Sequence, residues 1–256
     1  MAARSIWNGT ITFGLVNVPI KVFSATEDRT VHFHEVHAHD GARIEHKRIC
    51  AKEGKEVDYK EVVKGYEVKK GTFVVLSKEE IAAAAGEHSR LIAIEDFVCV
   101  DEIDPVYFDK TYYLGPREAE DAYRLLHDAL VASGRAGIGR WVFHNREYLV
   151  AVRALDDVIA LNTMRFADEL VPAKDLDLPK AAKKPGDREV KMASSLVDSL
   201  YDDFKAEAFE DSYRDALMEL IKAKAAGREP ELPHPDEGSE PDDLLAALEA
   251  SVKASA

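Results

Sequence analysis

The sequence has few cysteines, no long apolar run and no net positive charge. Its 256 residues include two cysteines, Cys50 and Cys99, which are too few for a disulfide framework. A reducing cytoplasm is therefore the expected compartment. No stretch of about 18 apolar residues occurs, so no membrane span and no membrane partner are expected. The opening residues also lack the basic start and apolar stretch of a secretory signal, so none is expected there.

The common catalytic motifs are missing as well. The sequence contains no P-loop, no Gly-x-Ser-x-Gly and no His-Glu-x-x-His. Gly137 and Gly139 form a Gly-x-Gly pair, but it follows a predicted helix and precedes a strand, the reverse of the order in a phosphate-binding loop. We therefore expect a non-enzymatic protein without a cofactor. A hydrolase with a carboxylate site is the weaker alternative, because 48 acidic residues make chance pairs common.

The net charge of −14 argues at first against nucleic acid. Half of that charge, however, comes from residues 229–256, which hold eight acids and one base. DNA binding depends on a local basic surface and not on the total charge. The charge balance therefore leaves a DNA-binding function open.

The first 26 residues predict two strands joined by a turn at Gly14. Ile11, Phe13 and Leu15 alternate on one face, and Val18, Ile20 and Val22 alternate in the next segment. This is the pattern of half-buried strands.

Several more strands follow, with one long helix between them. Residues 117–133 predict this helix, whose apolar stripe is formed by Ala122, Leu125, Leu126, Ala129 and Leu130, and Gly134 is its expected end. Ser77 and Glu80 form a capping box before a short helix over 81–85. Strands are expected at 31–34, 72–76 (short and buried), 91–100, 106–114, 141–144, 148–155 and 158–166. Short strands at close intervals predict a mainly β fold with some α, with a β-barrel or sandwich core.

The C-terminal part is different in character. Two helices are expected, over 190–204 and 212–226, with apolar stripes that pack either on another protomer or on their own barrel. The Pro-, Glu- and Gly-rich residues 228–241 predict a disordered linker. A short amphipathic helix is expected over 242–252. The predicted segments are a core (1–171), a connector (172–189), a helical arm (190–227) and an acidic tail (228–256).

Two stretches are locally basic. Residues 43–55 hold five bases and two acids, and residues 134–154 hold four arginines and one glutamate. Charge counting alone favours solvated faces with weak surface ion pairs, because most charge runs are no more than that. The alternative is contact with phosphates. The candidates for this are Arg43, Lys47, Arg48, Lys52, Arg135, Arg140, Arg146 and Arg153.

A histidine cluster lies just before the first basic stretch. His32 and His34 share one face of the strand expected there, and His37 and His39 follow. Such spacing can chelate a metal. No carboxylate is placed to complete a ligand set, so we favour the polar face of a half-buried strand over a metal site.

Blocks of sequence in the same order resemble the bacterial Ku family, the DNA end-binding proteins of non-homologous end joining. The blocks begin at Arg4–Thr26, His39–Ile44 and Lys47–Cys50 and continue to the C-terminus. The later ones are Asp109–Leu114, Lys191–Ala193, Leu196–Val197, Asp202–Phe204, Tyr213–Ile221 and Asp243–Val252. Relatives often have Cys-x-x-Cys where this chain reads Cys50-Ala51-Lys52-Glu53, so a zinc site of that design is not expected.

The resemblance implies a homodimer in which two β-barrels and a basic bridge form a ring that threads onto a double-stranded DNA end. It implies recognition of the backbone without sequence preference, and a nucleoid-associated location in a bacterial cytoplasm. The basic candidates would then line the inner surface. Arg146 is the strongest of them, since it lies at a hairpin tip, and Lys47 and Arg48 come next.

The resemblance also implies that the tail recruits the ATP-dependent DNA ligase of the pathway. Leu244, Leu245, Leu248 and Val252 would form the binding face of a helix that fits a groove in its partner. Packing of these leucines on the parent domain is the alternative. A second hypothesis for the whole chain is an acidic interaction scaffold with little DNA affinity.

Overall fold

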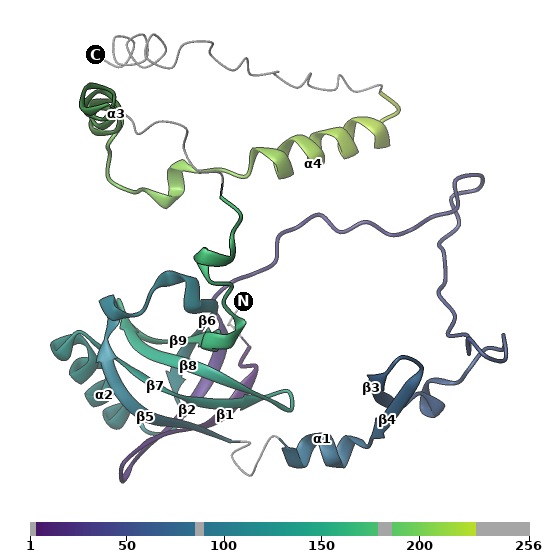
Figure 1. The fold of residues 1–256 in the computed structure, drawn as a ribbon, viewed down its shortest axis with the longest axis horizontal. Coiled ribbons are helices and arrows are strands. Elements are labelled where there is room, and N and C mark those ends of the chain that lie inside the picture. The colour runs from purple at the N-terminus through teal and green to yellow at the C-terminus, as the bar shows by residue number, and fades with distance from the viewer. Residues whose placement is uncertain (1–3, 85–89, 179–185, 229–256) are drawn as a thin grey trace. The chain divides into compact units, whose positions relative to one another are not determined.

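The computed structural model describes residues 4–84, 90–178 and 186–228. It divides the chain into two units, residues 1–29 with 33–175 and residues 30–32 with 176–256. Figure 1 shows the elements of both. The division into core, connector, helical arm and acidic tail that the sequence suggests stays a prediction.

A closed barrel of seven strands forms the centre of the first unit (Figure 1). The strands follow one another around the barrel in the order β1, β2, β6, β9, β8, β7, β5. Their bounds are β1 Trp7–Phe13, β2 Val16–Ser24, β5 Leu91–Cys99, β6 Phe108–Pro116, β7 Arg135–Phe143, β8 Arg146–Leu155 and β9 Val158–Met164. The predicted barrel is thus confirmed.

One parallel pair closes this barrel. β1 pairs with β5 through Thr10–Thr12 and Leu91–Ala93, whereas all other neighbouring strands of the barrel are antiparallel. Closure removes the free strand edges that an open sheet would expose to pairing with other chains.

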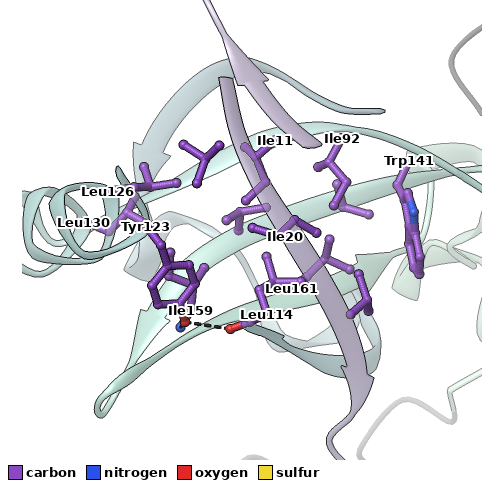
Figure 2. Packing of buried hydrophobic residues seen from close by; sticks show 14 residues of the cluster. Ile11, Ile20, Ile92, Leu114, Tyr123, Leu126, Leu130, Trp141, Ile159 and Leu161 are labelled. Atoms are coloured by element: carbon purple, nitrogen blue, oxygen red, sulfur yellow. Dashed lines mark hydrogen bonds between the residues drawn. The ribbon is translucent and has the colours of Figure 1, made fainter. Parts of the chain in front are cut away.

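Aliphatic side chains and the indole of Trp141 form the core of the barrel (Figure 2). Val18, Ile20 and Val22 are fully buried, as their alternation predicts, and so is Ile11. Burial of such a side chain stabilises the fold by about 1.5–3 kcal/mol. Leu15 departs from the prediction: it is 99% exposed, because β1 ends at Phe13 and Gly14 turns the chain at a φ of 56°.

The predicted long helix is α2, Glu120–Ser133. It ends at Gly134, whose φ of 62° is left-handed and suits glycine. Leu126 and Leu130 are buried against the barrel, as predicted, together with Tyr123. Leu125, the other leucine of the expected stripe, is 73% exposed.

The start of β7 was missed by the sequence analysis, which placed a strand only from residue 141. Gly137 and Gly139 lie inside the strand because the neighbouring β5 comes very close to them. A Cβ on Gly139 would lie 2.0 Å from the Ala93 carbonyl oxygen. Strand interiors use glycine at such approaches.

Residues 26–84 form a long excursion between β2 and β5, all of it described, and none of its side chains is buried. The strand expected at 31–34 is wrong: this segment has no ladder partner, and the isolated bridge nearby joins Val36 to Arg43. Alternating residues alone do not make a strand without a neighbour to pair with.

The excursion also carries the hairpin of β3 (Lys64–Lys69) and β4 (Thr72–Leu76), followed by α1 (Lys78–Ala84). The capping box is confirmed, since the Ser77 and Glu80 backbone amides each donate to the other's side chain. The strand predicted at 72–76 exists, but the prediction that it is buried is wrong. Every residue of β3 and β4 is exposed.

The second unit holds α3, Asp187–Ser199, and α4, Ser212–Ala225. The first predicted helix is therefore shorter than expected and ends before Leu200 rather than at Phe204. The second agrees with the prediction, and Gly227 follows it with a left-handed φ of 70°. Neither helix buries an apolar side chain: Met192, Leu196, Leu217 and Leu220 are half-buried, and Val197 and Tyr213 are exposed.

Candidate nucleic-acid interface

Two tight turns of the same design present basic residues on the excursion. In the first, the His37 amide donates to the Ala42 carbonyl (2.7 Å) and the Gly41 amide donates to the His37 carbonyl (2.8 Å). In the second, Cys50 and Gly54 make the equivalent bonds, at 2.9 and 2.8 Å, to Lys55 and Cys50. Gly41 and Gly54 have φ values of 71° and 67°, which favour glycine.

The predicted cations of the excursion differ in whether another side chain already holds them. Arg43, beside the first turn, and Lys52, within the second, make no ion pair within the described residues. Lys47 is held by Glu56 at 2.7 Å. The Arg48 guanidinium lies 4.9 Å from the centroid of the Tyr59 ring, which leaves its charge uncompensated. The cations without an ion pair have no such contact to break before they meet an anion.

Arg146 begins β8 at the tip of the β7–β8 hairpin, as predicted. His144 and Asn145 form the turn with φ values of 50° and 61°, the geometry of a two-residue hairpin. Arg146 Nη2 lies 3.5 Å from Glu169, and the guanidinium carbon lies 5.1 Å from the centroid of the Tyr148 ring. Its side chain is 62% exposed, so this weak pairing leaves it accessible.

The other arginines of the barrel have stronger partners. Arg140 donates to Glu147 at 2.7 Å and to Glu95 at 2.9 Å, and these two hydrogen bonds raise the pKa of its guanidinium. Arg153 donates to the buried Asn162 at 3.0 Å. The two carboxylates already neutralise Arg140, so a phosphate would have to displace them.

Arg135, at the start of β7, makes no ion pair in the part of the chain that the structure describes, and it borders an apolar groove. It is exposed. The structure thus does not bring the eight predicted cations to a single cluster: they divide between the excursion and the barrel.

A further cationic group was missed by the sequence analysis. Lys64, Lys69 and Lys70 lie on or beside the β3–β4 hairpin, and none has an ion pair among the described residues. Gly71 completes the turn with a φ of 81°, and its amide donates to Glu67 at 2.7 Å. The signal was present, since Lys-Lys-Gly lies between the alternating segment Tyr66–Val68 and the apolar run Phe73–Leu76, which is typical of a hairpin turn.

One member of the histidine cluster, His37, is held by a carboxylate, and so is His46, which lies outside the cluster. His37 Nδ1 lies 3.0 Å from Asp40, and His46 Nε2 lies 2.7 Å from Glu35. Over residues 4–84, 90–178 and 186–228, no three His, Cys, Asp or Glu side chains gather in a metal-binding arrangement. Leu244, Leu245, Leu248 and Val252, the predicted partner-binding residues, lie outside the described residues.

No helix among the described residues has both the length and the apolar composition needed to cross a bilayer.

Comparison with known proteins places this fold in a family. A family model described as the Ku70/Ku80 beta-barrel domain matches residues 12–192. The non-homologous end joining protein Ku of Anaeromyxobacter sp. (strain K) is 44% identical over 255 residues, covering 98% of this chain and 86% of the relative.

Two mycobacterial proteins of the same name are similar over the same extent. That of Mycolicibacterium smegmatis is 42% identical over 266 residues, with 98% of this chain and 82% of the relative covered. That of Mycobacterium tuberculosis (strain CDC 1551 / Oshkosh) is 40% identical over 267 residues, with 98% and 95% covered. The chain belongs to the Ku family.

Proposed function

We propose that this protein binds the ends of double-stranded DNA, without sequence preference, in double-strand break repair by non-homologous end joining. The observation that carries the proposal is its similarity, over nearly its whole length, to relatives named non-homologous end joining protein Ku. The role is one of binding and not of catalysis.

The free cations support contact with the DNA backbone. Arg43, Lys52 and Lys64 are exposed and have no ion pair among the described residues, and the same holds for Lys69 and Lys70. Lysine and arginine contacts to phosphates release condensed counterions and are indifferent to base sequence. This chemistry suits a protein that must accept any broken end.

We propose further that the active form is a homodimer, and the β3–β4 hairpin supports this. Tyr66 and Val74 are cross-strand neighbours on one face, and Phe73 and Val75 lie on the other. All four are exposed. An isolated two-stranded hairpin is marginal in water, and apolar residues on both faces are typical of a strand covered on both sides. A second copy would supply that cover.

The helices of the second unit support the same proposal. Val197 and Leu200 at the end of α3, and Tyr213 and Ile221 on α4, are exposed. Phe204 and Phe209 between the helices stack on each other with ring centroids 5.8 Å apart and are exposed too. Apolar surface of this extent marks an interaction site.

The last part of the proposal is recruitment of an ATP-dependent DNA ligase by the tail. It depends on the spacing of Leu244, Leu245, Leu248 and Val252, which is that of a helix that fits an apolar groove.

A competition assay tests end binding. A short linear duplex is bound in a mobility-shift experiment and challenged with excess closed circular DNA, then with excess linear DNA. We expect only linear DNA to compete. Equal competition by circles would reduce the activity to general affinity for polyanions, and the absence of a shift at low salt would favour the acidic scaffold.

Deletion of residues 229–256 tests the division of roles. We expect the shortened chain to retain DNA-end binding in the same assay and to lose ligase recruitment, measured by pull-down with the purified ligase. Loss of DNA-end binding on deletion would contradict this assignment. Sedimentation of the full chain tests the dimer, and a monomer at micromolar concentration would contradict that part.

A further inference from the structure

Aromatic side chains gather at one end of the barrel, and neither the free cations nor the proposed dimer contacts use them. Trp141 on β7 lies at their centre. Between ring centroids, Trp7, Tyr112 and Phe143 lie 5.7, 5.4 and 4.5 Å from it. Tyr148 lies at 6.3 Å. We call these five residues, which come from β1, β6, β7 and β8, the aromatic end.

The strand register places this end in line with the barrel interior. Trp141 and Tyr148 are ladder partners in β7 and β8, so their side chains share a face, and Trp141 is fully buried. Phe143 and Arg146 pair two positions nearer the hairpin turn and continue that face. Figure 2 shows Trp141 at the end of the core away from Leu126 of α2. The rings therefore lead from the core to the end of the barrel that α2 does not cover.

Four of the five rings reach the surface. Trp7, Tyr112, Phe143 and Tyr148 are half-buried. Tryptophan and tyrosine suit sites that are apolar on one side and wet on the other. The exposed His144 extends the row into the turn, with its ring centroid 4.0 Å from that of Phe143. A flat ligand that comes to this end of the barrel thus meets ring surface.

Two arginines stand at the same end, each with a single loosely held carboxylate. Arg146 Nη2 lies 3.5 Å from Glu169, and its guanidinium carbon lies 5.1 Å from the centroid of the Tyr148 ring. Arg165 follows the end of β9, which pairs with the start of β8, and its Nη2 lies 3.4 Å from Asp109. Exposed ion pairs of this length contribute little to stability. A phosphate can therefore take the place of either carboxylate.

We propose that the aromatic end stacks the unpaired bases of a single-stranded overhang at a broken DNA end, while Arg146 and Arg165 meet its phosphates. Aromatic rings beside cations are the usual composition of sites for single-stranded nucleic acid, and every base has a face that can stack. Bases within a duplex already stack on one another, so the site distinguishes an overhang from a blunt end. The inference rests on the proposed DNA-end function and adds to it a preference among ends.

Overhangs with and without bases test the stacking. In a mobility-shift titration the full chain binds three duplexes that share one double-stranded part. The first is blunt, the second has a short thymine overhang, and the third has an equally long abasic overhang, which keeps the phosphates and lacks the bases. We expect the thymine overhang to bind more tightly than the abasic one, by about fivefold or more for each stacked base. The comparison uses the wild type, so it does not depend on the folding of a variant.

Tryptophan fluorescence gives a second readout at the same place, because Trp7 and Trp141 are the only tryptophans of the 256 residues. A base that stacks on this cluster quenches its emission. We expect the thymine overhang to quench the fluorescence, and the abasic overhang and the blunt duplex to leave it nearly unchanged.

Phe143→Leu tests the part of the ring nearest the turn, with Phe97→Leu as the matched control. Phe97 lies on β5, is 41% exposed and packs against Phe13 rather than the aromatic end. The ratio of thymine to abasic affinity should fall about fivefold in Phe143→Leu, the contribution of one ring, and stay as in the wild type in Phe97→Leu.

Several results would overturn the proposal. Equal affinity for the thymine and abasic overhangs would show that phosphates alone hold the overhang, and binding of the blunt duplex in the same titration would leave the end-binding function standing. Equal quenching by all three duplexes would report a change in the protein and not stacking. Quenching that grows with protein concentration without DNA would assign the aromatic end to a second copy of the chain. No shift with any duplex would refute end binding itself, and this inference with it.

Discussion

Tyr123 on α2 donates its hydroxyl proton to the carbonyl of Leu114 on β6 at 2.6 Å. The Tyr123 hydroxyl oxygen in turn accepts a hydrogen bond from the Ile159 amide of β9 at 2.9 Å. Leu114 and Ile159 face each other in the β6–β9 ladder, so one phenol from the helix joins two strands of the barrel (Figure 2).

Tyr123→Phe is expected to destabilise the fold by about 1–3 kcal/mol, because it leaves a buried carbonyl and a buried amide without partners. Chemical denaturation measures the change. Tyr113→Phe, on the exposed side of β6, is the control and should leave the free energy of unfolding nearly unchanged. Equal stability of the two variants would show that the Tyr123 hydroxyl does not contribute to the free energy of unfolding.

His127 predicts a pH-dependent stability. This buried ring has two acceptors, the Asp128 carboxylate at Nδ1 and the Asp156 carbonyl at Nε2, both at 2.9 Å. A neutral imidazole donates at only one nitrogen, so these hydrogen bonds favour the charged form and raise the pKa of His127 above its ordinary value of 6.5. The stabilisation is full below pH 6.5 and is lost as the pH rises through the raised pKa.

Urea unfolding of the wild type and of His127→Gln, at intervals from pH 6 to pH 9, measures the stabilisation that the charged His127 contributes. The difference in free energy of unfolding should shrink as the pH rises, because the two proteins differ only in the side chain at position 127. A difference that stays constant or grows would contradict a charged His127 in the folded state.

Gly139→Ala is expected to disrupt the barrel. The added Cβ would lie 2.0 Å from the Ala93 carbonyl oxygen and 2.9 Å from the Ile94 Cα, so backbone must move. The expected loss is about 3 kcal/mol or more, larger than ordinary overpacking. Gly115→Ala is the comparison, since its nearest neighbour is the outer part of the Phe23 ring at 3.1 Å, which can move aside. Similar melting temperatures for both variants would refute the argument.

The lysines of the β3–β4 hairpin predict a change in salt dependence. If Lys69 and Lys70 contact phosphates, Lys69→Ala/Lys70→Ala should lower the slope of log affinity against log salt by about 0.9 for each lysine, equally for all DNA sequences. Arg140→Gln should change the slope little, because Glu95 and Glu147 already neutralise that side chain. The measurement is DNA-end affinity between 50 and 200 mM salt, a range in which about 10³–10⁵ in affinity is lost for six to ten phosphate contacts. A larger effect from Arg140→Gln would reverse the assignment.

Much of the barrel could be predicted from local pattern. Val18, Ile20 and Val22 alternate, Gly134 ends α2, and Ser77 caps α1 with Glu80, each as the sequence indicates. The failures have a common cause. Val31–His34 alternates but has no neighbouring strand, and Gly139 lies in a strand because Ala93, distant in sequence, packs against it. Pairing between distant segments is invisible to periodicity.

The candidate site was less predictable for the same reason. Lys47 appears free when residues 43–55 are counted, yet its partner Glu56 is the next residue along. Arg140 has Glu147 within its own stretch, but its second partner, Glu95, reaches it from β5, 45 positions away in the sequence. A count of local charge therefore finds basic segments without telling which cations are available to a ligand.

The parallel contact between β1 and β5 has a kinetic consequence. Thr10 meets Leu91 about 80 positions further along the chain, and the whole excursion must be looped out before the barrel can close. Loop closure of this length makes the contact late and slow to form, because its entropy is lost before any strand pairing compensates for it. Refolding should therefore pass through an open sheet whose β1 and β5 edges are still unpaired, and this is the stage at which aggregation competes most strongly with the native barrel.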